Sequence, residues 1–123
     1  MPIERINPNT MPQVSRNLLR GYSMVSKSGN TVYTAGQVST DSNMGIVGPG
    51  DIEAQIRQTW HNIEQGMKAA GGSLNDIVRV VNFVTDIQAL PIWYEVWNEL
   101  FEPENRPVST FVEIPRLAIP GLM

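Results

Sequence analysis

Two successive strand–helix–strand passages limit the fold of this chain more than any other feature. Apolar residues recur every three to four positions over residues 52–67, which predicts an amphipathic helix that begins after Asp51 and stops at Gly71-Gly72. Leu90–Phe101 predicts a second helix, and we expect three of its aromatic residues, Trp93, Trp97 and Phe101, in the core. The segments that follow the two helices are rich in Val, Ile and Phe and predict strands at Ile77–Thr85 and Val108–Ile114.

The residues before the first helix predict strands as well. We expect a short strand near Ile3–Ile6 and a hairpin of Tyr22–Lys27 with Thr31–Val38, closed by Ser28-Gly29-Asn30. Right-handed crossovers would place both helices on one face of a single sheet. The opposite face then needs another cover, so we expect a homo-oligomer.

Composition and charge exclude several classes of protein. A chain of 123 residues predicts one domain over 1–123, and the absence of cysteine excludes disulfides, thiolate nucleophiles and cysteine-ligated metals. The net charge of −3 gives no electrostatic reason to bind nucleic acid. No apolar run approaches the ~18 residues that a membrane span needs, and no signal peptide is visible. We therefore expect a cytoplasmic protein that binds neither nucleic acid nor membrane.

No metal or phosphate motif is present. His61 lies in the middle of the first predicted helix without a second His or Cys at ligand spacing, so we expect an ordinary surface histidine and no metal site. Gly48-Pro49-Gly50 lacks the pattern of a phosphate-binding loop and predicts a turn.

The order of several short motifs resembles one known family from Tyr22 onward. The motifs are Tyr22, Gly29-Asn30, Thr34-Ala35-Gly36-Gln37, Asp51-Ile52, Ala69-Ala70-Gly71 with Leu74, Asp76-Ile77-Val78, Val84-Thr85-Asp86 and Val112-Glu113-Ile114-Pro115-Arg116-Leu117. With them the chain resembles the reactive intermediate deaminase family (RidA or YjgF-like, formerly called endoribonuclease L-PSP). The resemblance implies an α+β, chorismate-mutase-like fold with two helices on one face of the sheet. It also implies a homotrimer around a central barrel with a small-molecule cleft between subunits, and hydrolysis of 2-imino or enamine acids without a cofactor.

The family's carboxylate-binding arginine is absent at the matching position. Alignment back from Val112 to Leu117 places Ser109 where the family has that arginine, followed by Thr110. A guanidinium matches both oxygens of a carboxylate, so its loss weakens the expectation of a small imino-acid substrate. Arg106 lies three residues earlier and does not replace it. From the resemblance, the candidate catalytic residues are Tyr22, which matches a tyrosine that lines the family's cleft, and Ser109 and Thr110, which lie at and after the position of the missing arginine.

Other positions of the family's cleft also differ here. Ala35, beside Gly36, takes the place of a common serine, and Tyr94 takes that of an asparagine on the second helix. These three residues, together with Arg20 at the cleft mouth, are our candidates for substrate binding. The family's last strand, with its glutamate, would follow Pro120-Gly121, and we expect it to be missing from this sequence.

Two classes of function stay open. The first is a cofactor-free deaminase that hydrolyses an imine, an enamine or a related C–N compound. The second is a ligand-binding or regulatory protein of the same fold, or an enzyme for a larger aromatic substrate, without 2-imino acid deaminase activity. The loss of the guanidinium favours a neutral, ring-bearing ligand. The family's older ribonuclease label fits poorly with an acidic chain.

Overall fold

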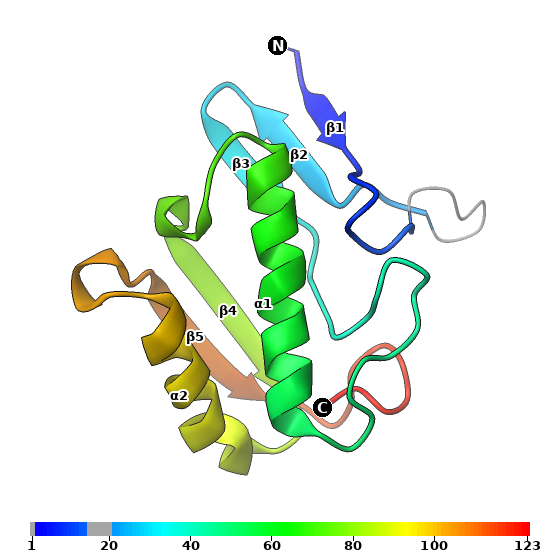
Figure 1. Ribbon diagram of the computed structural model, residues 1–123, viewed down its shortest axis with the longest axis vertical. Coiled ribbons are helices and arrows are strands. Elements are labelled where there is room, and N and C mark those ends of the chain that lie inside the picture. The colour runs from blue at the N-terminus through cyan, green and yellow to red at the C-terminus, as the bar shows by residue number, and fades with distance from the viewer. Residues whose placement is uncertain (1, 15–20) are drawn as a thin grey trace.

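The elements follow the predicted order in the computed structural model, which describes residues 2–14 and 21–123 (Figure 1). The strands and helices are β1 Glu4–Ile6, β2 Val25–Ser28, β3 Thr31–Thr34, α1 Ile52–Ala69, β4 Arg79–Val84, α2 Leu90–Leu100 and β5 Val108–Glu113. Short 3-10 turns occupy Leu74–Asp76, Ile87–Ala89 and Pro103–Asn105. Both predicted helices and the later strands are confirmed to within about two residues. The hairpin strands are shorter than predicted, since β3 ends at Thr34 rather than Val38.

The strands form two hydrogen-bonded sheets, so the single sheet that we expected is wrong for this chain. β1, β2 and β3 make an antiparallel sheet in that order, and β4 pairs with β5 in parallel. Within the described residues, no strand pairing joins β3 to β4. Helix α1 lies across the front of both sheets and α2 lies in front of the β4–β5 pair, so both helices cover the same side (Figure 1). This arrangement is α+β.

Helix α1 begins and ends where the sequence predicts. The Asp51 carboxylate accepts the backbone N–H of Ala54 at 3.0 Å, which satisfies one of the free donors of the first turn. Gly71 follows the helix with a φ of +90°, a conformation that costs a residue with a Cβ atom about 1 kcal/mol or more. Lys27 of β2 donates from Nζ to the Ala70 carbonyl at 3.0 Å and so fixes this helix end to the sheet.

Aromatic side chains from both helices form the main core. The indole rings of Trp93 and Trp97 stack at 4.7 Å, and Phe101 lies 4.7 Å from Trp97. Trp60 of α1 completes the cluster at 5.4 Å from Phe101. All four side chains are at most 5% exposed, which confirms the prediction that Trp93, Trp97 and Phe101 are core residues.

The opposite face of the sheets is uncovered. Side chains alternate along a strand, and Val80 and Phe111 pack against the helical core, so their neighbours in β4 and β5 face away. The apolar residues on this open face are Tyr33 (66% exposed), Val81 (42%), Phe83 (51%) and Val108 (67%). An uncovered apolar face is confirmed for the single chain, and the homo-oligomer expected from it stays a prediction.

None of the helices in the described part of the chain is both long and apolar enough to cross a bilayer.

Candidate functional site

Three candidate residues lie together at the open end of the β2–β3 hairpin. The Ala35 N–H donates to the Met24 carbonyl at 2.8 Å, which continues the ladder one step past Thr34. Ser23 and Gly36 are the next residues outward on the two arms, and Tyr22 lies one residue beyond Ser23. Tyr22 is 54% exposed. A Cβ atom built at Gly36 would meet nothing within 4 Å, so the backbone there is open to a ligand.

Side-chain amides hold the segment that follows Gly36. Gln37 donates from Nε2 to the Ala35 carbonyl at 3.1 Å. Asn62 of α1, which is 1% exposed, donates from Nδ2 to the carbonyls of Val38 and Thr40 at 2.9 Å each. The loop that leaves the hairpin is therefore fixed to α1, and the Ala35-Gly36 backbone keeps a defined position.

Two other candidates, Ser109 and Thr110, lie in β5, where the structure adds a residue that the sequence analysis missed. Asn82 of β4 donates from Nδ2 to the Ser109 Oγ and to the Thr110 carbonyl, at 3.1 Å each. An asparagine inside the apolar run Val80–Val84 was a signal that could have identified it, because strand interiors are poor in asparagine. Only the parallel register, which pairs Asn82 with Phe111, brings it to Ser109.

Strand alternation separates the side chains of Ser109 and Thr110. Ser109 shares a face with Phe111, whose ring lies 5.4 Å from Trp93, while Thr110 points to the open face. Tyr94 of α2 is 50% exposed and contacts the same indole at 5.1 Å. Tyr94 and Ser109 are therefore on the helix side of the sheet, and Thr110 is on the other.

Two basic residues, Arg106 and His61, stand apart from these groups. Arg20 falls outside the described residues. Arg106 donates from Nη2 to Asn98 Oδ1 of α2 at 2.8 Å, consistent with its exclusion as a substitute for the family's arginine. His61 is exposed on α1, as expected for a surface histidine. Across residues 2–14 and 21–123, no group of three or more His, Cys, Asp or Glu side chains could hold a metal ion.

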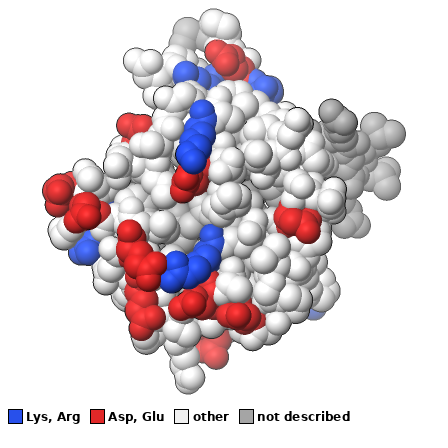
Figure 2. All heavy atoms as spheres, viewed as in Figure 1, with Lys and Arg blue, Asp and Glu red and all other residues white. Residues whose placement is uncertain are grey.

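The helix side of the molecule shows more acidic than basic side chains (Figure 2). Its ion pairs include Lys68 with Glu64 at 2.8 Å on α1 and one pair that joins the two helices. Arg57 of α1 and Glu99 of α2 make a two-pronged contact at 2.8 and 3.1 Å. The hydrogen bonds and charge of Arg57 lower the pKa of the Glu99 carboxyl, and the hydrogen bond to Glu99 raises the pKa of the Arg57 guanidinium. Neither residue is a candidate site residue, and both are exposed.

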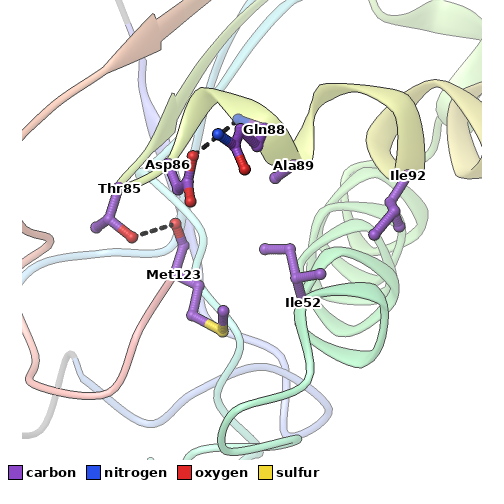
Figure 3. A pocket seen from close by; sticks show the side chains of 7 residues that line it. All are labelled: Ile52, Thr85, Asp86, Gln88, Ala89, Ile92 and Met123. Atoms are coloured by element: carbon purple, nitrogen blue, oxygen red, sulfur yellow. Dashed lines mark hydrogen bonds between the residues drawn. The ribbon is translucent and has the colours of Figure 1, made fainter.

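A shallow hollow of about 180 Å³ lies between the start of α1 and the segment after β4 (Figure 3). Its lining residues are Ile52, Thr85, Asp86, Gln88, Ala89, Ile92 and Met123. The Met123 carbonyl accepts the N–H of Thr85 at 2.8 Å, and Asp86 Oδ1 accepts the N–H of Gln88 at 2.9 Å. A second hollow of the same size lies between the helices, beside Trp60 and His61. Neither hollow includes a candidate site residue.

The candidate residues thus form two groups in different sheets. The first group is Tyr22, Ala35 and Gly36 at the hairpin, and the second is Asn82, Ser109 and Tyr94 on the helix side of β4 and β5. Within the part of the chain that the structure describes, no hydrogen bond joins the two groups, and neither of the two hollows described above lies between them.

Comparison with known proteins gives consistent results. The sequence profile of the family described as Endoribonuclease L-PSP matches residues 14–123. The chain is 34% identical over 114 residues to the 3-aminoacrylate deaminase RutC of Acinetobacter baylyi, covering 93% of this chain and 86% of that protein. It is 33% identical over 91 residues to the 2-iminobutanoate/2-iminopropanoate deaminase of Escherichia coli, and the match covers 72% of this chain and 70% of that protein. The crystal structure of RidA from an Antarctic Psychrobacter superposes with a TM-score of 0.84 at 30% identity, covering 97% of this chain and 91% of that one.

Proposed function

The chain belongs to the Endoribonuclease L-PSP (RidA/YjgF) family, and on that premise we propose that it is a cofactor-free hydrolase that releases ammonia from an imine, an enamine or a related C–N compound. The main support is its similarity over most of its length to proteins named as deaminases of an enamine and of two imino acids. A cytoplasmic setting is part of this proposal.

We place the reaction in a cleft between subunits of a homotrimer. The hairpin group and the β5 group lie in different sheets of one chain, which favours a cleft that takes one group from each of two neighbours. The uncovered apolar face, with Phe83 and Val108, supplies a surface for assembly. Tyr22, Ser109 and Thr110 keep their proposed catalytic roles, and Ala35, Gly36, Tyr94 and Arg20 their proposed binding roles.

The chemistry needs little from the protein. The carbon of an imine is already electrophilic, so a positioned water and a group that steers protons suffice. Tyr22 has a phenol OH and Ser109 an alcohol OH, and each can donate and accept a hydrogen bond. The exposed Gly36 backbone adds an N–H and a carbonyl without a side chain in the way.

One observation favours a second candidate function. Ser109 is neutral, and its Oγ is bonded to the amide of Asn82 rather than to a cation. A protein that binds a neutral ligand, or acts on a larger aromatic one, without 2-imino acid deaminase activity would fit this environment.

Ammonia release from imines generated in situ tests the proposal. We expect little turnover of iminopropionate or iminobutyrate and faster turnover of a ring-bearing imine, with the protein eluting as a trimer by light scattering. If no imine releases ammonia, the proposal of a hydrolase is wrong and the second candidate function, a ligand-binding protein, remains. Fast turnover of the two small imino acids would instead show that Ser109 does not limit carboxylate binding.

A further inference from the structure

Asn82 and Ser109 together present a hydrogen-bond acceptor next to a donor. Asn82 Nδ2 carries two protons and donates to both Ser109 Oγ and the Thr110 carbonyl. A carbonyl can only accept, so the bond to Thr110 fixes which end of the side-chain amide is the nitrogen. The carbonyl oxygen Oδ1 of Asn82 is therefore the end that is directed away from these partners.

The Ser109 hydroxyl is oriented by the same contact. Its oxygen accepts from Asn82, so its own proton remains to be donated elsewhere. Among the described residues, neither Asn82 Oδ1 nor the Ser109 proton has a protein partner. Both bonds lie where solvent reaches them in the single chain, and Ser109 is exposed.

We propose that Asn82 and Ser109 form a recognition pair for a neutral amide-type group on the ligand, such as a carboxamide, a lactam or a ureido group. A carbonyl of such a group accepts the Ser109 proton, and the adjacent N–H donates to Asn82 Oδ1. Oδ1 and Nδ2 are attached to one carbon, so the ligand amide closes a ring of hydrogen bonds with both side chains. The inference rests on the proposed function only in taking Ser109 as a site residue.

A carboxylate cannot satisfy this pair. It has only acceptor oxygens, and one of them would face the Asn82 carbonyl oxygen without a proton between them. An acceptor that the bound ligand covers and leaves without a donor costs more affinity than a hydrogen bond gains. We expect the amide of a matched pair of ligands to bind about tenfold more tightly than the carboxylate.

Binding of two matched pairs of probes to the full-length protein tests this inference without turnover. The pairs are pyruvamide with pyruvate and nicotinamide with nicotinate, followed by amide NMR titration. We expect the amide of each pair to bind more tightly. An equal or tighter carboxylate, or no binding of any of the four probes, would overturn the inference.

Variants of the pair assign the preference to these two side chains. Ser109→Ala removes the donor. Asn82→Val removes the acceptor and puts a residue that favours strands in its place. Each change should abolish the preference for the amide. Ser109→Arg supplies a guanidinium and should reverse it. Asn75→Val, at an exposed position outside the pair, is the matched control and should keep the preference. A preference that survives both Ser109→Ala and Asn82→Val would also contradict the assignment.

The outcomes separate this inference from the proposed function. If the amide preference holds but no imine releases ammonia, the hydrolase is wrong and the recognition pair stands. If imines are hydrolysed but carboxylates bind as well as amides, the pair is wrong and the hydrolase stands.

Discussion

Arg57 and Glu99 join the two helices through parallel hydrogen bonds of 2.8 and 3.1 Å from the guanidinium to the carboxylate. This is the bidentate geometry in which an arginine pairs most specifically with a carboxylate. Both side chains are exposed, so water and salt weaken the pair.

The ion pair predicts a dependence of stability on pH. Because Arg57 lowers the pKa of Glu99 in the folded protein, the pair contributes fully above the ordinary glutamate pKa. That contribution is lost as the pH falls through the lower folded-state pKa. The free-energy difference of unfolding between wild type and Glu99→Gln should therefore shrink on acidification, and also with added salt. A difference that stays constant with pH would contradict this, and Glu95→Gln is the matched control on the same helix.

Replacement of Gln55 should cause a local loss of order near Met123. Its side chain is 4% exposed, donates to the Gly48 and Gly121 carbonyls at 3.1 and 3.0 Å, and accepts the Met123 N–H at 2.9 Å. Gln55→Leu should cost about 1–3 kcal/mol in urea unfolding, because these three groups lose their partner. Amide exchange at Thr85, whose N–H donates to Met123, should speed up. Gln65→Leu on the same helix should do neither.

Truncation of Phe101 should create a cavity in the aromatic core and lower the stability of the protein. The side chain is 1% exposed and contacts Trp60 and Trp97. Phe101→Ala should lower the free energy of unfolding by about 3–5 kcal/mol with little change in the slope of denaturant unfolding. A loss of under about 1 kcal/mol would mean that the cluster repacks around the gap.

A substitution of Phe83 tests whether the open face of the sheet holds subunits together. Phe83→Lys places a charge on this face at a side chain that is 51% exposed in the single chain, so it should lower the assembled mass in light scattering without unfolding the protein. Ile87→Lys, at a residue 42% exposed in the 3-10 turn that follows β4 rather than on the open face, should leave the mass unchanged. A wild-type protein that is already monomeric would contradict the prediction.

Substitution of Arg106 should have no effect on activity. Its guanidinium is bonded to Asn98 of α2, and no candidate site residue contacts it through a hydrogen bond in the described part of the chain. Arg106→Ala should therefore leave the rate of ammonia release unchanged, while Ser109→Ala changes it. A large loss with Arg106→Ala would show that this arginine, rather than Ser109, handles the substrate.

The sequence by itself determined the order and type of the elements. Local signals act within a few residues, so the Asp51 cap, the Gly71 stop and the spacing of Trp93, Val96 and Trp97 were enough to locate the helices. Motif order was also enough to identify the family. The candidate site was predicted only as a set of residue types along the chain, because no local signal says which strands pair.

Tertiary structure alone decided which of those residues meet. The parallel register of β4 and β5 brought Asn82 to Ser109, and strand alternation placed Thr110 on the opposite face. It also left β3 and β4 in separate sheets, so no strand pairing joins the hairpin residues to the β5 residues within the described part of the chain. Register depends on contacts between segments far apart in sequence, and a shift of one residue would exchange the two faces of a strand.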